Sequence, residues 1–166
     1  LKTLEAIGPG EVGVNSRTLD DKTWIVTYSA AESPVVYYRY DRTPCAEGKL
    51  TKLFSARPAR DGKPLAPMWP LEIKSRDGLT LVSYLSLPKT ADANNDGKAD
   101  KPVPMVLLVH GGPWARDIYG YDAYHQWLAN RGYAVLSVNY RGSTGFGKAF
   151  TNAGDGEWAG KMHDDL

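Results

Sequence analysis

The sequence has little of several features that would point to a particular class of protein. It contains one cysteine, Cys45, so no disulfide can form within the chain. It has no apolar run near the roughly 20 residues that a membrane-spanning helix needs, and Leu1 opens no signal-peptide pattern. Neither charge sign is in excess, because 20 lysines and arginines oppose 19 aspartates and glutamates. The sequence therefore predicts a soluble chain that binds neither nucleic acid nor a membrane, and it leaves the compartment, cytoplasm or periplasm, open.

Two smaller absences also carry information. Cys45 lies between Pro44 and the pair Glu47–Gly48, a setting typical of a turn, so we expect an inert structural cysteine and not a nucleophile. The chain does not begin with methionine, which indicates that it does not begin where its gene begins.

The part of the chain before Pro70 is rich in predicted strands. Thr23–Tyr28 and Pro34–Tyr40 combine aromatic and β-branched residues and are joined by a short polar loop, which indicates a hairpin. A further strand over Leu50–Ser55 makes Leu19–Ser55 a meander of about three or four strands. One such sheet is marginal alone, so we expect it to pack against sheets outside this chain.

A proline-rich stretch, Ala56–Pro70, follows and predicts a linker and a domain boundary. The second part opens with two strands, Leu71–Lys74 and Thr80–Leu87, which flank Asp77–Gly78, a strong hairpin signal.

The most informative segment is an apolar run that ends in a glycine loop. Val106–Val109 is apolar without alternation, which is typical of a buried parallel strand covered on both faces. In the loop that follows, Gly111 and Gly112 let the backbone approach a reacting carbonyl, and Pro113 stiffens the exit. Preorganised amides there would stabilise an oxyanion by about 3 to 4 kcal/mol per donor, although a plain tight turn explains the two glycines equally well. His110 is expected to position this loop and not to act as a base.

The order of elements after this loop predicts a β-α-β unit with parallel strands. A helix is expected over Tyr121–Arg131, with Gly132 as its C-terminal cap and a second strand over Tyr133–Val138. The apolar face of this helix is predicted to consist of Tyr124, Trp127 and Leu128.

A polar insertion before the glycine loop has the spacing of a calcium loop. Its oxygen-bearing residues are Asp92, Asn94, Asp96 and Asp100. Position twelve of such a loop is Val103, so the bidentate carboxylate is missing. The same residue types favour turns without any metal, so we expect a solvated polar turn and neither a metal nor another cofactor, with a calcium site as the alternative.

Three segments together resemble the prolyl oligopeptidase family of serine peptidases, closest to its acylaminoacyl-peptidase branch. These are Val-His-Gly-Gly-Pro at 109–113, the stretch 121–135, and Asn-Tyr-Arg-Gly-Ser-Thr-Gly-Phe-Gly at 139–147. The resemblance is strong in the last third of the chain and weak in the first. It implies an α/β fold in which residues 71–166 form the first half of an α/β-hydrolase domain. Residues 1–70 would then be the strand-rich end of a β-propeller with its linker.

The resemblance also implies a function: family members cleave short peptides by serine acyl transfer. It places the oxyanion loop at His110, Gly111 and Gly112, with the Gly112 amide as one donor. The chain contains no Gly-x-Ser-x-Gly, and Ser143 has a glycine directly before it, so Ser143 is not the nucleophile. In the family the serine, aspartate and histidine follow the point that Leu166 occupies here, so residues 1–166 alone are expected to be inactive.

Other histidines and the Asn-Tyr-Arg motif are given structural roles. His125 and His163 precede the expected nucleophile and are interpreted as helix residues, while Tyr140 and Arg141 match a family motif without a catalytic assignment. The expected partners are a peptide substrate and the remainder of the hydrolase domain, and a homo-oligomer is compatible with the sequence. The alternatives are a carboxylesterase or lipase of the same fold, and a non-catalytic, calcium-dependent binding module.

Residues 1–166 expressed alone are expected to aggregate or to stay partly unfolded, because a partial parallel sheet leaves strand edges and apolar faces uncovered. Light scattering and thermal unfolding test this expectation. A cooperative transition from a monodisperse monomer would contradict it.

Overall fold

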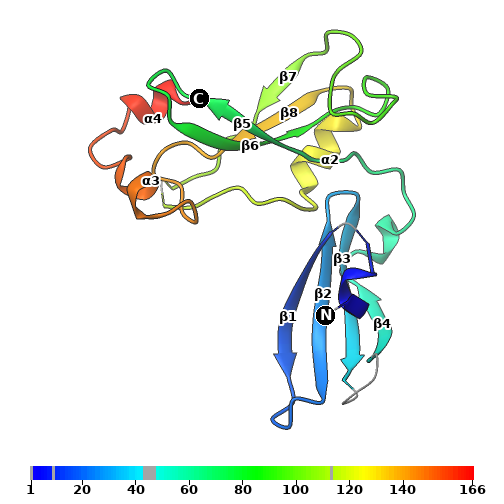
Figure 1. Cartoon of the computed structure of the whole chain (residues 1–166). Helices are drawn as coiled ribbons and strands as arrows, with labels where there is room; N and C mark the ends of the chain where they lie inside the picture. The colour runs from blue at the N-terminus through cyan, green and yellow to red at the C-terminus, as the bar shows by residue number, and fades with distance from the viewer. Residues whose placement is uncertain (1, 9, 43–47, 113) are drawn as a thin grey trace. The chain divides into compact units, whose positions relative to one another are not determined.

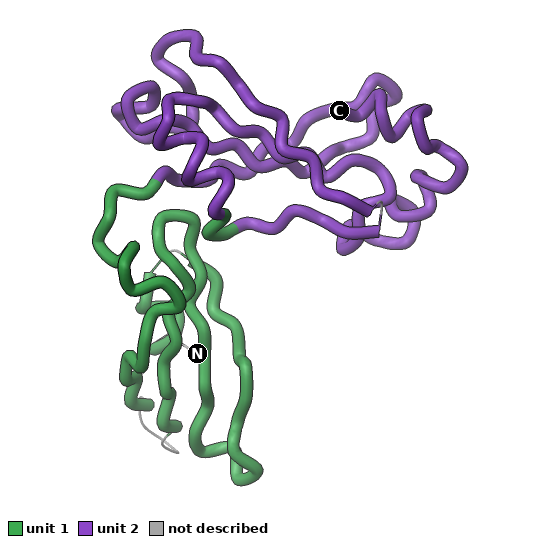
Figure 2. Tube along the Cα trace, turned by 180° about the vertical axis from the view of Figure 1, so that it is seen from behind, with its two compact units in different colours: residues 1–65, 120–122 green, residues 66–119, 123–166 purple. Residues whose placement is uncertain are grey.

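The structure is a computed structural model that describes residues 2–8, 10–42, 48–112 and 114–166 (Figure 1). It is mostly β, with two four-stranded sheets and a few short helices. The chain forms two compact units, Leu1–Leu65 with Gly120–Asp122, and Ala66–Tyr119 with Ala123–Leu166 (Figure 2). Cys45 lies outside the described residues. Within the described part of the chain, no helix combines the length and apolarity needed to span a bilayer.

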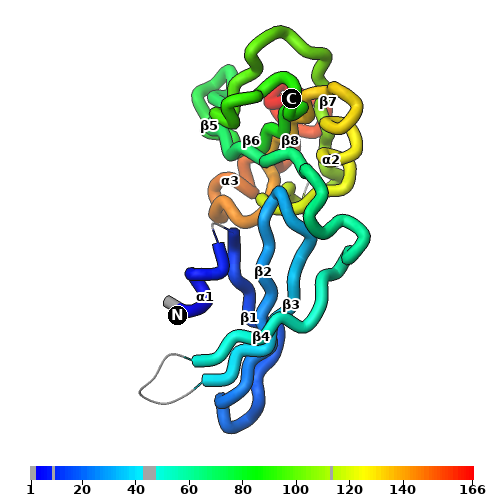
Figure 3. Tube along the Cα trace, turned by 90° about the vertical axis from the view of Figure 1, so that its right-hand side faces the viewer, coloured from blue at the N-terminus to red at the C-terminus, as the bar shows by residue number. Residues whose placement is uncertain are grey.

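The first unit contains an antiparallel meander, in which each strand pairs with the next one along the chain (Figure 3). The hairpin and the meander are therefore confirmed, but the sheet begins earlier than predicted. Its first strand precedes Leu19 and was missed because it is polar and contains a glycine. The strands are β1 (Glu11–Arg17), β2 (Thr23–Ala30), β3 (Ser33–Asp41) and β4 (Lys49–Ser55).

This sheet carries aromatic residues on both faces. On one face, Val26 and Tyr40 pack with Leu4 of the short helix α1 (Lys2–Glu5), and Trp24 meets Tyr40 edge to face at 6.0 Å. On the other face, the rings of Tyr37 and Phe54 stack at 4.6 Å, and Phe54 remains 56% exposed. A large aromatic pair left half in water marks this second face as incompletely covered within the described residues.

The predicted linker is not wholly irregular. A 3-10 helix forms over Pro58–Arg60, where the fixed φ of proline suits a first helical turn. The last residues of the stretch already belong to β5 (Trp69–Lys74), so the strand begins two residues before the predicted start at Leu71.

The second unit contains a mixed sheet in the order β5-β6-β8-β7. β5 pairs with β6 (Thr80–Ser86) as the predicted hairpin, and Gly78 has the positive φ of +89° that its turn requires. β6 and β8 (Ala134–Val138) are antiparallel, whereas β7 (Met105–Leu107) and β8 are parallel, as predicted. The helices of this unit are α2 (Ala123–Ala129), α3 (Lys148–Asn152) and α4 (Lys161–Asp164).

The prediction that the apolar run before the glycine loop is covered on both faces is wrong for this chain. β7 is three residues long, with Met105 59% and Leu107 37% exposed, and Val109 beyond it is 44% exposed. Among the described strands β7 pairs only with β8, and α2 packs mainly against β8 and β6. The apolar side chains of β7 therefore lie at an edge of the described sheet.

The buried face of α2 also differs from the prediction. Its buried residues are His125, Gln126 and Ala129, whereas Tyr124 is 65% and Trp127 54% exposed. The guanidinium of Arg131 covers the Trp127 ring at 4.5 Å, which gives this exposed indole a favourable contact.

The polar residues of α2 enter the interior because they find hydrogen-bond partners there. The His125 ring bridges the hydroxyls of Ser86 (3.0 Å) and Ser137 (2.9 Å). The Gln126 side-chain amide accepts from the Ala66 N–H (2.8 Å) and donates to its carbonyl oxygen (2.7 Å). Burial without such partners would be unfavourable, so a rule that sorts residues by hydrophobicity alone selects the wrong face.

Candidate functional site

The glycine loop follows β7, and only one of its two glycines lies where a larger side chain would collide with other atoms. Gly112 has φ +146°, and a Cβ there would lie 2.9 Å from the backbone nitrogen of Trp114. Gly111 has no atom within 4 Å of an added Cβ. The loop's own backbone therefore requires glycine at 112 and not at 111, while Pro113 lies outside the described residues.

The loop meets the segment that leaves the neighbouring strand β8. The Tyr140 hydroxyl donates to the carbonyl oxygen of His110 at 3.0 Å, and the two rings stack at 4.5 Å and 14°. The Ser143 hydroxyl lies 2.9 Å from His110 Nε2 and 2.6 Å from the Tyr140 carbonyl oxygen. His110 is therefore held through both its ring and its backbone.

The hydroxyl of Ser143 lies as close to His110 Nε2 as a nucleophilic serine lies to its catalytic base. Unlike such a serine, however, Ser143 is not accessible to a substrate. Ser143 is completely buried, so no substrate carbonyl reaches its hydroxyl. This burial agrees with the expectation that Ser143 is not a nucleophile, and it gives the contact a structural use.

The residues after the glycine loop form hydrogen bonds with the same segment that leaves β8. Asn139, also completely buried, accepts from the Asp117 N–H (2.8 Å) and donates to the Val82 carbonyl (3.0 Å). The Thr144 N–H donates to the Ala115 carbonyl at 2.9 Å. The two loops thus form one hydrogen-bonded layer.

Arg141 holds the segment after β8 through ion pairs with two aspartates. Its guanidinium, almost fully buried, binds both carboxylate oxygens of Asp165 and both of Asp77 at 2.8 to 2.9 Å. The hydrogen bonds that Arg141 donates to Asp165, and secondarily those that it donates to Asp77, raise the pKa of Arg141 above its usual value. Arg141, followed by Ser75, holds the pKa of Asp77 well below its usual range. The structure thereby ties β8, α4 and the β5–β6 turn together.

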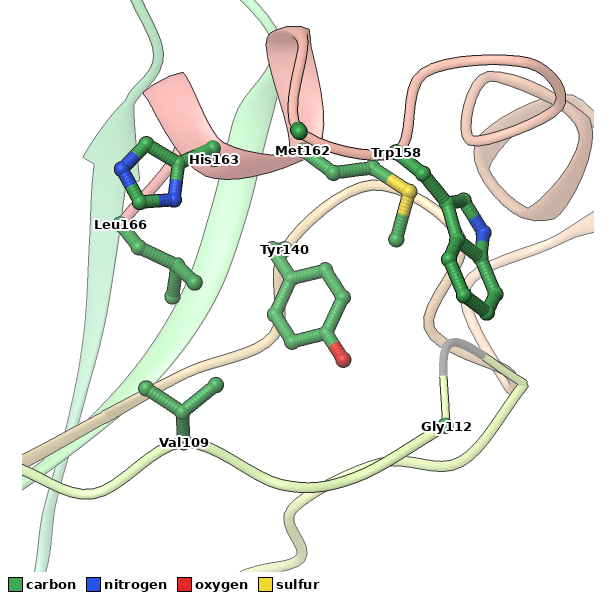
Figure 4. A pocket seen from close by; sticks show the side chains of 8 residues that line it. Val109, Gly112, Tyr140, Trp158, Met162, His163 and Leu166 are labelled. Carbon is green, nitrogen blue, oxygen red and sulfur yellow. The ribbon is translucent and has the colours of Figure 1, made fainter.

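A cavity of about 220 Å³ lies beside the loop (Figure 4). The Tyr140 side chain projects toward it, with its hydroxyl on the side of Gly112. Burial, and secondarily the charge of Asp117, raise the pKa of Tyr140, so its hydroxyl keeps its proton and remains a donor at neutral pH. The cavity is mostly apolar and is lined by Val109, Gly112, Tyr140, Trp158, Ala159, Met162, His163 and Leu166.

The two histidines given structural roles lie in different places. His125 is buried in the interior between two serines, and His163 of α4 lines the cavity. His110 contacts Tyr140 through both its ring and its carbonyl oxygen.

The candidate calcium residues mostly bind their own loop. Asp92, 5% exposed, accepts from the backbone N–H groups of Asp96 (2.9 Å) and Gly97 (3.1 Å). Asn94 and Asp100 also hydrogen-bond within the loop. Over the described ranges no three histidine, cysteine or acidic side chains gather as metal ligands would. These contacts favour the polar-turn interpretation.

Sequence reasoning missed the fastening of the glycine loop by Asn139, Tyr140 and Ser143. The partners are 22 to 33 residues apart in the chain. The available signal was a run of polar residues directly after an apolar strand, which marks a place where side chains meet at a strand end.

Comparisons with known proteins place the chain among serine peptidases of one family and agree with the fold. A sequence profile described as the prolyl oligopeptidase family matches residues 119–166. Dipeptidyl aminopeptidase BIII of Pseudoxanthomonas mexicana is 79% identical over all of this chain and 24% of its own length. Dipeptidyl peptidase family member 6 of Caenorhabditis elegans is 43% identical over 95% of this chain and 23% of its own length.

Among solved structures, acylaminoacyl peptidase of Pyrococcus horikoshii shares the fold, with a TM-score of 0.69 at 21% identity. The match covers 95% of this chain and 24% of that one. The chain thus spans about a quarter of the length of the proteins it matches.

The Arg141 anchor generates a prediction about stability. In the complete protein, Arg141→Met should destabilise the fold by about 3 to 5 kcal/mol, because it leaves the buried Asp165 carboxylate without its cation. Arg76→Met is the matched control, since Arg76 pairs with Asp164 at the surface and should contribute at most about 1 kcal/mol. Urea unfolding measures both, and equal effects would contradict the assignment.

The lowered pKa of Asp77 generates a second prediction, on pH dependence. A carboxyl whose pKa is lower in the folded state contributes stability above its unfolded pKa of about 3.9, and this contribution is lost as the pH falls below that value. The free energy of unfolding should therefore decrease between pH 5 and pH 3, and Asp77→Asn should flatten that decrease. Urea titrations across this range measure it, and identical slopes in both proteins would disprove it.

Proposed function

Because the chain belongs to the prolyl oligopeptidase family, we propose that the protein containing it hydrolyses short peptides by serine acyl transfer. The observation that carries the proposal is the loop His110-Gly111-Gly112, which is held beside an apolar cavity with Gly112 in a backbone conformation that suits glycine. The names of the relatives, dipeptidyl aminopeptidase and dipeptidyl peptidase, support a substrate from which a dipeptide is released.

The role of this segment is to stabilise charge. Attack on the scissile carbonyl by a serine outside residues 1–166 places a negative charge on the former carbonyl oxygen. The Gly112 N–H donates to that oxygen, and a second donor comes from the residue after the serine. The acid and base also lie outside these residues. Ser143, His125 and His163 take no part in the bond changes.

The finer fold assignment belongs to the same proposal. Residues 71–166 form the first part of an α/β-hydrolase domain, which the sheet order β5-β6-β8-β7 with its parallel pair supports. Residues 1–70 form the end of a β-propeller with its linker. The half-exposed Tyr37–Phe54 pair supports this assignment, because a propeller blade packs against a neighbour on each face.

The competing activity is that of a carboxylesterase or lipase, which would use a similar His-Gly-Gly loop. The strand-rich first unit, which such an enzyme does not need, favours the peptidase. Turnover of dipeptidyl and N-acylaminoacyl p-nitroanilides by the complete protein, compared with p-nitrophenyl esters, separates the two. Hydrolysis of esters alone would overturn the peptidase assignment.

The two glycines supply a matched pair of variants for the oxyanion role. Gly112→Ala should lower kcat by about 100- to 1,000-fold on anilides, because the new Cβ collides with the Trp114 nitrogen and displaces the donor amide. Gly111→Ala, whose Cβ meets no atom within 4 Å, should stay within a few-fold of wild type. Urea unfolding of both variants checks that the fold is retained. Full activity of Gly112→Ala would refute the role of the loop.

A further inference from the structure

We infer that Tyr140 and Ser143 are positioning residues that aim the Gly112 N–H at the oxyanion, acting through His110. The inference rests on the proposed function, since it assigns the parts that make the oxyanion loop rigid. Its evidence is a chain of contacts that begins at the exit of β8 and ends at the peptide group joining Gly111 to Gly112.

The loop needs such support because the strand before it ends early. β7 closes at Leu107, and one further ladder bond, from the Leu108 N–H to the Leu136 carbonyl at 2.8 Å, continues the pairing. Two consecutive glycines then follow, and glycine has more backbone freedom than any other residue. A donor amide that moves freely loses most of its value, because oxyanion stabilisation depends on preorganisation.

The first contact fixes the peptide group between His110 and Gly111. The Tyr140 hydroxyl donates to the His110 carbonyl oxygen at 3.0 Å. Since a peptide group is planar, holding its carbonyl oxygen also sets the direction of the Gly111 N–H. The stacked rings of Tyr140 and His110 keep the donor and acceptor in register.

The second contact reaches the donor itself. His110 Nδ1 lies 2.9 Å from the Gly111 carbonyl oxygen, and a proton on Nδ1 makes this a hydrogen bond. The Gly112 N–H belongs to the same planar peptide group as that carbonyl, and in a trans peptide it points the opposite way. The orientation of the His110 ring therefore sets the direction of the Gly112 N–H.

Ser143 holds the ring in that orientation. Its hydroxyl lies 2.9 Å from His110 Nε2, the ring nitrogen opposite to the one that faces Gly111. With the ring proton on Nδ1, Nε2 accepts, and the Ser143 hydroxyl donates its one proton to it; Ser143 is itself fixed because its side chain is completely buried. The His110 ring is held at Nε2 by Ser143 and along its face by Tyr140. It can therefore hold the Gly111 carbonyl oxygen at Nδ1.

The base of this arrangement is rigid. The residues from Ser137 to Ser143 are all buried, and Arg141, between the two positioning residues, is bound to Asp165 and Asp77. Side chains with locked neighbours hold a site within the fraction of an ångström that catalysis needs. Tyr140 and Ser143 thus connect the buried, ion-paired segment after β8 to the glycine loop.

The test uses Tyr140→Phe and Ser143→Ala in the complete protein, with Tyr133→Phe, a more exposed tyrosine just before β8, as the matched control. Tyr140→Phe removes one hydroxyl and keeps the stacked ring. Each positioning variant should lower kcat for a dipeptidyl p-nitroanilide by about 10- to 100-fold, as misplacement by about 1 Å does, with KM within about two-fold. The control should match wild type.

A peptide aldehyde separates positioning from a general structural role. It binds as a tetrahedral adduct whose oxygen occupies the oxyanion position, so its Ki should weaken in both variants by the same factor as kcat. The Ki of the matching peptide in which a methyl group replaces the aldehyde, so that no oxygen reaches that position, should stay unchanged. If Ser143→Ala fails to fold, as urea unfolding would show, Tyr140→Phe decides the question alone.

The outcomes distinguish this inference from the proposed function. Wild-type protein that cleaves no anilide overturns the proposed function and this inference with it. Wild-type cleavage with unchanged kcat in Tyr140→Phe overturns the positioning role and leaves the proposed function standing. Equal losses in affinity for the aldehyde and for its methyl analogue would also overturn the positioning role, since they indicate general damage to the binding site.

Discussion

The parallel pairing of β7 with β8 is the constraint on which the candidate site depends. Parallel strands end at the same edge of a sheet, so the chain leaving β7 and the chain leaving β8 emerge side by side. This places His110 against Tyr140, 30 residues further along the chain. With antiparallel pairing the two segments would lie at opposite edges, and the glycine loop would have no neighbour to hold it.

Buried polar groups fix several contacts within the second unit. His125, Gln126 and Asn139 each use a side chain to bind groups distant in sequence, and Arg141 joins two carboxylates. Hydrogen bonds of this kind contribute modestly to stability when made but are costly to leave unmade, so they restrict the number of alternative packings. The result is a defined geometry at the strand exits in a unit whose sheet has an exposed edge.

Several apolar side chains of the described strands stay exposed. Met105 and Leu107 of β7 and Phe54 of β4 are the side chains of strands that carry apolar residues on more than one face. The chain spans about a quarter of the relatives that it matches. Apolar faces of this kind gain stability when other elements cover them, so residues 1–166 alone and the longer protein are expected to differ in stability.

The residues by themselves determined much of the local structure. The Asp77–Gly78 hairpin, the β2–β3 hairpin and the β-α-β order follow from turn residues and short-range patterns, and the motifs from His110 to Gly147 identified the family. These features depend on neighbours within a few residues, for which backbone and side-chain preferences are strong.

The tertiary structure decided which face of α2 is buried, how short β7 is, and what holds the glycine loop. His125 and Gln126 point inward, where Tyr124 and Trp127 were expected, because Ser86, Ser137 and Ala66 satisfy their hydrogen bonds. Ser143, which the sequence excluded as a nucleophile, contacts His110 and holds its ring in the proposed positioning role. Such contacts join positions 12 to 60 residues apart. They exist only once the strands have paired, so a pattern read along the chain does not contain them.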